Sequence, residues 1–244
     1  MSIELYAEKV QKMIDQIVNS QKENIRKAAA IMADSVKSGG IIFTFGTGHS
    51  HMIAEEVMYR AGTLVPIYAI LEQGVSGDRD VTKSEFTERL EGYAELILNY
   101  HKLTDKDVLI IISNSGRNAV PIEMAMGAKK RGIPVIAVTS LEYSKGQPSR
   151  HSSGKRLFEL ADVTIDNCGV LGDAVIKLDG LEQPVAPTSN LTANFIIHSL
   201  TMETVIALLD MGITPPVFFS GNLDGAREKN EEYLAQYWNR IRVW

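Results

Sequence analysis

The sequence predicts an α/β protein built on a mainly parallel, doubly wound sheet. Short apolar segments alternate with amphipathic segments of helical periodicity along most of the chain. Two of the apolar segments run directly into small polar loops that lead into helices. In such a sheet the crossovers are right-handed, and ligands bind where the strands end. We therefore expect a functional site at the carboxyl edge of the sheet.

The first segment, 3–37, carries apolar residues at helical spacing and predicts a long amphipathic helix, with a break near Asn19 and Ser20. Gly39 and Gly40 end this helix. The expected elements that follow are strand 41–45, helix 52–61, strand 64–71 and an irregular polar excursion at 72–85.

The same alternation continues in the second half of the chain. The expected elements there are helix 88–100, strand 108–112, helix 120–130, strand 134–139, a second polar excursion at 140–154, helix 155–160, strand 163–165, a short strand at 174–178 within a loop, helix 191–210 and a C-terminal helix at 224–239. We find no internal repeat and no linker. We predict a single domain over 1–244 with its core at about 25–210 and helical extensions at both ends.

Composition excludes several classes of protein. The net charge of -5 argues against a broad nucleic-acid-binding face. The single cysteine, Cys168, excludes an internal disulfide and a cysteine-based zinc cluster. No uninterrupted apolar run is long enough to span a membrane, and no apolar signal core follows Met1. We expect a cytoplasmic protein that binds neither membrane nor nucleic acid.

The most informative loop is 113–118, which follows strand 108–112 directly and precedes helix 120–130. Its residues Ser113, Asn114 and Ser115 place hydroxyl and amide groups at a helix N-terminus, where backbone N–H groups and the helix dipole favour an anion. Helix capping is the alternative, but a cap needs only one such residue. The loop lacks the nucleotide-binding glycine motifs, which favours a phosphate on another kind of molecule.

A second loop, 46–51, joins strand 41–45 to the following helix. Its glycines could serve only a tight turn, yet Gly48 is followed by His49, Ser50 and His51, which favour ligand contact. The two histidines could also hold zinc, but no third protein ligand is evident nearby. We therefore expect no metal and no cofactor.

These two loops together resemble the sugar isomerase (SIS) domain family over about residues 25–209. The resemblance implies a three-layer α/β/α sandwich with a five-stranded parallel sheet of flavodoxin-like winding, and it implies a phosphosugar ligand. The resemblance implies that the serine loop holds the phosphate and that Ser50 corresponds to a serine that contacts sugar or phosphate oxygens. The phosphate-binding residues implied are Ser113, Asn114, Ser115, Gly116 and Asn118.

Within that family the chain is similar to phosphoheptose isomerases and to stand-alone bacterial SIS proteins. The segment Ala54-Glu55-Glu56-Val57 resembles a helix that carries a catalytic glutamate, which points to Glu56 and, second, to Glu55. The segment around His198 resembles the helix that carries a catalytic histidine. Isomerisation needs two such proton-transfer groups.

Each of these residues also has a purely structural interpretation. Glu55 and Glu56 could form a solvated surface pair, and His198 could be a hydrogen-bonded core residue on an apolar helix. The family places sugar-hydroxyl contacts at Thr188, Ser189 and Asn190, which could instead only cap the late helix. Asn190 stands where phosphoheptose isomerases have glutamine, so the match departs from the pattern there.

The first hypothesis is a phosphosugar isomerase that works by Glu56 and His198. A second is an etherase acting on N-acetylmuramic acid 6-phosphate or an amino-sugar-phosphate deaminase, because Ser115-Gly116-Arg117 also resembles the etherase branch. A third is a sensor that binds a phosphosugar without turnover. SIS proteins assemble through helices like the N-terminal one, so we expect a homodimer or homotetramer.

Overall fold

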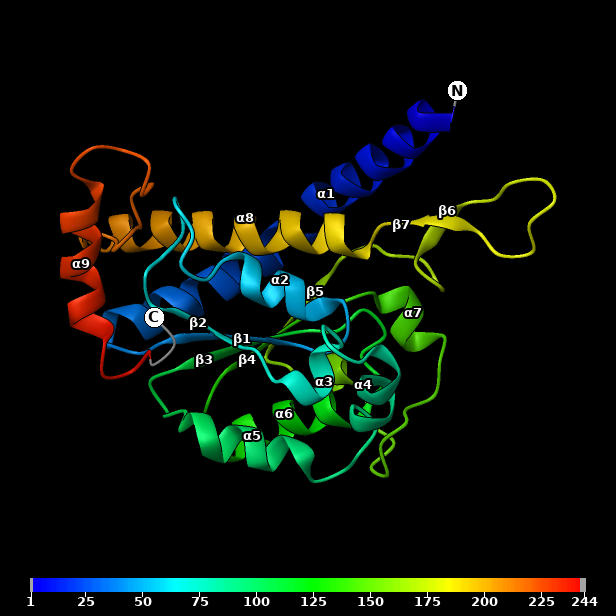
Figure 1. Ribbon diagram of the computed structural model, residues 1–244, viewed down its shortest axis with the longest axis horizontal. Coiled ribbons are helices and arrows are strands. Elements are labelled where there is room, and N and C mark those ends of the chain that lie inside the picture. Colours follow the sequence, from blue (N-terminus) through cyan, green and yellow to red (C-terminus); the bar gives the residue numbers. More distant parts are fainter. Residues whose placement is uncertain (1, 242–244) are drawn as a thin grey trace.

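A sheet of five parallel strands lies at the centre of the molecule, in the order β2-β1-β3-β4-β5 (Figure 1). The computed structural model describes residues 2–241. The strands are β1 (Ile42–Gly46), β2 (Ile67–Ile70), β3 (Val108–Ile112), β4 (Val135–Thr139) and β5 (Val163–Asp166). All four neighbouring pairs are parallel. The parallel, doubly wound sheet predicted from the sequence is confirmed.

Both faces of the sheet are buried, which explains why its strands are continuous apolar runs. In β3, Ile110 and Ile112 belong to the apolar core on one face. Leu109 and Ile111 belong to the core on the other face. Because side chains alternate along a strand, a run of consecutive aliphatic residues fills both cores at once.

Helices cover both faces and make the three expected layers (Figure 1). One layer holds α1 (Ser2–Lys37), α2 (Ser50–Glu56) and α8 (Ser189–Asp210). The opposite layer holds α5 (Tyr93–His101), α6 (Ala119–Lys130) and the short 3-10 helix η1 (Leu157–Glu159). The C-terminal helix α9 (Ala226–Tyr237) lies at the end of the sheet away from the polar loops.

The N-terminal helix differs from the prediction in being continuous from Ser2 to Lys37. The expected break near Asn19 and Ser20 is absent, and the Ser20 hydroxyl donates to the Gln16 carbonyl, 2.8 Å away within the same helix. Its second half packs in the core, whereas its first half projects beyond the body of the molecule (Figure 1).

The two polar excursions are also more regular than predicted. The first contains α3 (Gln73–Ser76) and α4 (Val81–Thr87), and the second contains α7 (Leu141–Lys145). Side-chain caps explain these short helices: Asp80 accepts from the Lys83 N–H, and Ser140 accepts from the Tyr143 N–H.

Several predicted helices are shorter in the structure. Helix 52–61 ends at Glu56, helix 88–100 begins only after Gly92 at Tyr93, and helix 155–160 is the 3-10 helix η1.

The short strand expected at 174–178 pairs outside the main sheet. It forms β6 (Ala174–Ile176), which runs antiparallel to β7 (Val185–Pro187) in a projecting hairpin (Figure 1). The second strand of this hairpin was not predicted, because Val185–Pro187 is only three residues long and ends in proline.

Among residues 2–241, the helix α8 is long and apolar enough to cross a membrane by length and composition alone. The expectation that no apolar run could span a membrane counted uninterrupted apolar residues, and α8 intersperses Thr, Ser and His among them. Its buried residues, such as Ile196 and Leu200, pack in the same core as α1. The compartment stays a prediction.

The strand order makes a crevice between β1 and β3. The chain leaves β1 for α2 on one face of the sheet and leaves β3 for α6 on the other. The loops 47–49 and 113–118 therefore separate at the carboxyl edge. In a sheet of this winding, that reversal point is where ligands bind.

Candidate functional site

A cavity of about 710 Å³ opens at this edge, between the loops that follow β1 and β3. Its walls also include residues from α3, α4, α7, the segment after α7 and the start of α8. Ten predicted binding residues line it: Gly48, His49, Ser50, His51, Ser113, Asn114, Ser115, Asn118, Ser189 and Asn190.

The serine loop turns tightly at Gly116, whose φ is 57°. A Cβ at this position would lie 3.1 Å from both the Ser144 and the Thr139 hydroxyl oxygens, so glycine meets a conformational and a spatial requirement. The Gly116 N–H donates to the Ser113 Oγ at 3.2 Å. Gly116 itself does not line the cavity, and its contribution is to shape the loop.

A buried amide fixes the orientation of Asn114. The Asn167 Nδ2 donates to the Asn114 Oδ1 at 2.9 Å, and Asn167 is only 2% exposed. Because the Asn114 oxygen is engaged, its NH₂ group is the end available to a ligand. The hydroxyl proton of Ser113 is likewise available, since its oxygen already accepts from Gly116. The loop thus presents donors, which suit an anionic ligand.

The loop after β1 requires glycine because the first turn of α2 lies very close to the end of β1. A Cβ on Gly46 would lie 2.4 Å from the Ser50 carbonyl oxygen, so the first turn of α2 can sit directly on the end of β1 only with glycine there. The His51 Nδ1 lies 2.6 Å from the Gly48 carbonyl oxygen and must donate to it. His51 therefore presents Nε2 as its other polar atom.

Glu88 connects the two loops, and the sequence analysis did not select it. Its carboxylate accepts from the Thr47 hydroxyl at 2.8 Å and from the Asn118 Nδ2 at 2.6 Å. Burial raises the pKa of Glu88, although these two hydrogen bonds and the nearby Arg89 and Arg150 oppose the rise. Four carboxylates line the cavity, from Asp78, Glu85, Glu88 and Asp173.

Three guanidinium groups line the cavity, from Arg89, Arg117 and Arg150. The Arg117 Nη1 donates to the Gln147 Oε1 at 3.1 Å, but its buried Nε has no hydrogen-bond partner among residues 2–241. Burial and the neighbouring Arg150 lower the pKa of Arg117. A bound anion would compensate both the desolvation and the repulsion.

The start of α8 is held by Asp173 from the segment before β6. Its Oδ1 accepts from the backbone N–H groups of Thr188 at 3.0 Å and Ser189 at 2.7 Å, and its Oδ2 accepts from the Ser189 hydroxyl at 2.7 Å. Thr188 is fully buried and does not line the cavity. Asn190, which follows, does line it. Thr188 and Ser189 therefore anchor the helix, while Asn190 is placed to meet a ligand.

The structure brings Glu56 and His198 together, but outside the cavity lining. The His198 Nε2 lies 3.2 Å from the Glu56 Oε1, and Arg60 lies 3.0 Å from the same oxygen. Helix geometry explains why Glu56 lies outside the cavity. Ser50 begins α2 at the cavity and Glu56 ends it, which separates them by about 9 Å along the helix axis. Glu55 also lies outside the lining and is exposed.

Several residues that line the cavity were not selected by the sequence analysis. Glu88 is the first residue of the predicted helix 88–100, and Arg150 lies in the second polar excursion. Arg117 stands within the serine loop and was noted only as part of a motif. Its charge next to a phosphate-type loop was the one signal that could have identified it.

Comparison with known proteins gives consistent findings. A family model described as SIS domain matches residues 5–140. A UPF0309 protein of Geobacillus kaustophilus is 40% identical over 241 residues, covering 99% of this chain and 96% of the relative. A UPF0309 protein of Halalkalibacterium halodurans is 42% identical over 236 residues, covering 97% and 94%.

Two solved phosphoheptose isomerases share the architecture. The enzyme from Neisseria gonorrhoeae superposes with a TM-score of 0.57 at 16% identity, covering 83% of this chain and 96% of its own. The enzyme from Francisella tularensis gives 0.54 at 19% identity, with the same coverage of 83% and 96%. At these identities the likeness shows the fold alone.

The burial of Glu88 predicts a pH-dependent stability difference between the wild type and Glu88→Gln. The pKa of Glu88 is raised above its ordinary 4.5, so the folded state holds the proton more tightly than the unfolded state. Wild-type free energy of unfolding should therefore fall, relative to the variant, as pH rises from about 4.5 through the folded pKa, and then level off. Urea unfolding across this range measures the difference. A constant difference would contradict the assignment.

Proposed function

We propose that this chain, which belongs to the SIS domain family, binds a phosphorylated sugar and interconverts its aldose and ketose forms. The donor-rich, arginine-lined cavity at the carboxyl edge of the sheet carries the proposal. Its volume of about 710 Å³ lies within the range of small-molecule sites. The shared architecture with two phosphoheptose isomerases gives further support.

In this proposal the phosphate lies on the serine loop. Ser113 and Ser115 supply hydroxyl donors, and Asn114 supplies the NH₂ group that Asn167 orients. The N-terminus of α6 adds backbone N–H groups and a favourable dipole. The guanidinium of Arg117, with its unpaired Nε, offers a charge-assisted hydrogen bond to the same anion.

Glu88 is our candidate for the proton-transfer group. Its carboxylate would take a proton from the hydroxyl-bearing carbon next to the carbonyl of the open-chain sugar, which gives an enediolate. The proton of that hydroxyl would pass to the former carbonyl oxygen, and the Glu88 carboxyl would return its proton to the former carbonyl carbon, which leaves the new carbonyl on the neighbouring carbon. Each carboxylate oxygen accepts one hydrogen bond, from Thr47 or from Asn118, and keeps a lone pair for this task. Its raised pKa brings the group closer to neutral pH, where a general base works best.

The Glu56–His198 pair is the rival candidate for this role, because a family resemblance points to it. Met52 lies one turn before Glu56 on α2 and lines both the cavity and the shallower pocket around Glu56. The pair is therefore adjacent to the cavity rather than within it. The cavity position of Glu88 is the observation that leads us to prefer it.

The serine loop can be tested by ligand-induced stabilisation. A panel of five- to seven-carbon sugar phosphates, amino-sugar phosphates and inorganic phosphate should raise the melting temperature of the wild type selectively. At a ligand concentration of about a hundred times Kd the rise should be about 5–10 °C. Ser113→Ala combined with Ser115→Ala should abolish it, whereas Ser20→Ala on the exposed part of α1 should not. A folded wild type that no phosphorylated compound stabilises would refute the proposal.

Turnover separates the two proton-transfer candidates. On the sugar phosphate selected by the panel, Glu88→Gln should lower kcat at least about a hundredfold and change KM little. Glu56→Gln should stay within a few-fold of the wild type, like Glu232→Gln, a control on exposed α9. The opposite order would assign the role to Glu56. Release of lactate or ammonia would replace isomerisation by lyase or deaminase chemistry.

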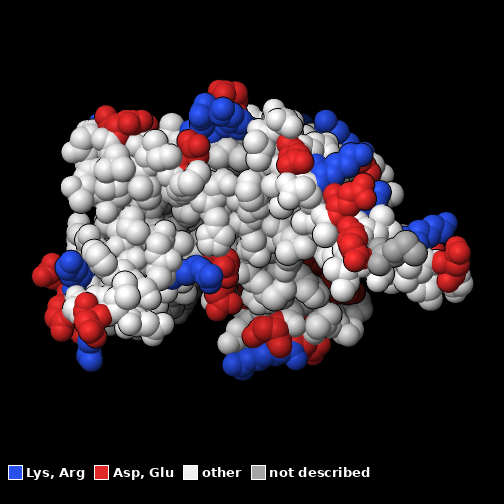
Figure 2. All heavy atoms as spheres, turned by 90° about the horizontal axis from the view of Figure 1, so that it is seen from above, with Lys and Arg blue, Asp and Glu red and all other residues white. Residues whose placement is uncertain are grey.

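We also propose that the protein is a homodimer or homotetramer. The projecting half of α1 exposes Ile3 and Leu5, and most of the stability of a helix in a protein comes from tertiary packing of its apolar face. Leu191, Met202 and Leu209 lie exposed on one face of α8. The surface around this helix carries few charged side chains, which gather at the rim and along α1 (Figure 2). Burial of this apolar surface against a second copy would stabilise the assembly.

Sedimentation equilibrium tests the assembly. We expect a mass at least twice the 26.9 kDa of the chain. Met202→Glu combined with Leu209→Glu should lower that mass by placing charges in the apolar contact, while Lys229→Glu on α9 should leave it unchanged. A wild-type mass of one chain would contradict the proposal.

A further inference from the structure

The segment 146–154 passes beside the serine loop and brings Arg150 to it. The backbone N–H of Arg150 donates to the Arg117 carbonyl at 2.8 Å. Its Nη1 donates to the Asn118 Oδ1 at 3.0 Å. Asn118 in turn donates to Glu88. The position of this one side chain thus bears on both the anion-binding loop and the carboxylate in the cavity.

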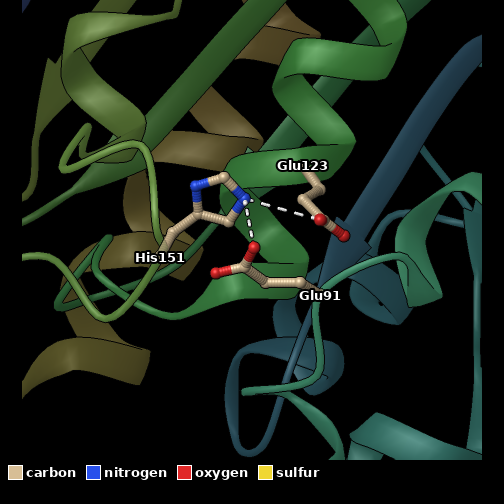
Figure 3. Close-up of side chains that lie close together, drawn as sticks. All are labelled: Glu91, Glu123 and His151. Atoms are coloured by element: carbon tan, nitrogen blue, oxygen red, sulfur yellow. Dashed lines mark ion pairs between the residues drawn. The ribbon is translucent and has the colours of Figure 1, made fainter.

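The residues next to Arg150 turn away from the cavity and enter a separate cluster with Glu91 and Glu123 (Figure 3). The His151 Nε2 lies 3.4 Å from Glu123 and 3.8 Å from Glu91, and the His151 side chain is only 8% exposed. Ser152 donates its N–H and its hydroxyl to the two oxygens of Glu91, both at 2.6 Å. Three separate segments meet here: the turn before α5, helix α6 and the segment 146–154.

Hydrogen bonds on the far side of the ring determine which nitrogen of His151 carries the proton. The Ser153 N–H donates to the His151 Nδ1 at 3.1 Å. The Ser153 hydroxyl oxygen, which accepts from the Lys155 N–H at 3.2 Å, lies 2.7 Å from the same Nδ1 atom. Because Nδ1 accepts the Ser153 N–H, the tautomer that fits this bond carries its proton on Nε2, the atom that faces the two carboxylates (Figure 3).

This proton position distinguishes the cluster from a metal site. Two glutamates and a histidine whose ligand atoms lie within 4.8 Å of one another could hold a divalent cation by distance alone. A cation would need the lone pair of Nε2, with the proton moved to Nδ1, where the Ser153 N–H already points. The Glu123 oxygens also both accept from the Gly92 N–H, at 2.8 Å. The geometry fits a polar contact between segments, in which Nε2 lies within ion-pair distance of both carboxylates.

We propose that Glu91, Glu123 and His151 form a clasp that positions Arg150 on the serine loop and so sets the affinity of the cavity for its anionic ligand. None of the three lines the cavity, so they act through Arg150 as positioning residues. The inference rests on the proposed function, because it takes the serine loop to be the anion site. A side chain as flexible as arginine loses less conformational entropy on binding an anion when its backbone is already fixed.

The test is a double-mutant cycle with inorganic phosphate as the probe, measured by isothermal titration calorimetry at constant salt. Arg150→Ala should weaken binding about tenfold. His151→Leu, which removes the Nε2 proton, should weaken it by a smaller factor. The double variant should bind no more weakly than Arg150→Ala alone, because His151 acts through Arg150. His151→Gln, whose amide can donate from about the position of Nε2, should restore most of the affinity.

Each outcome bears on one proposal in particular. If wild-type protein does not bind phosphate, the proposed function fails and the clasp fails with it. If wild type binds and His151→Leu binds equally well, only the clasp is overturned. The clasp is also overturned if His151→Leu weakens phosphate binding by the same factor in the wild type and in Arg150→Ala, because the effect would then not pass through Arg150. Stoichiometric zinc uptake that Glu123→Gln abolishes would make the cluster a metal site instead. Glu123→Gln also serves as the second variant should His151→Leu fail to fold.

Discussion

In a parallel sheet all strands end at the same edge, and here the chain leaves β1 toward one face and β3 toward the other. The two outgoing loops cannot pack against each other, so a crevice lined by helix N-termini is left between them. The polar groups of the site are brought together by this arrangement. It places Thr47 and Ser113 on opposite walls of one cavity although they are far apart in sequence.

The cavity concentrates charged groups whose hydration is reduced by the surrounding protein. Glu88 accepts two hydrogen bonds that link the walls, and burial still raises its pKa. Arg117 carries a buried, unpaired Nε beside a second guanidinium. These are costs to folding that the apolar cores must offset. Such costs are typical where a ligand completes the set of interactions, which is why they support a functional role for this cavity.

The separation of Glu56 from the cavity follows from helix geometry. The glycine at position 46 lets the first turn of α2 approach the end of β1, so the N-terminal end of that helix faces the cavity. The opposite end, with Glu56, then points toward α8 and His198. Glu88 reaches the cavity by another route, because α4 folds back over the edge of the sheet after the Asp80 cap.

The sequence by itself determined the sheet and the position of the serine loop. The apolar run Val108–Ile112 is a strand with those bounds, and the serine loop that follows it lies at the strand end, as predicted. Both depend on short-range preferences: aliphatic residues buried on two faces, and small polar residues at a helix start. Only the tertiary structure brought in Glu88, Arg150 and the clasp around His151. Their partners lie about thirty or more residues away, so their roles depend on packing between segments that no local pattern encodes.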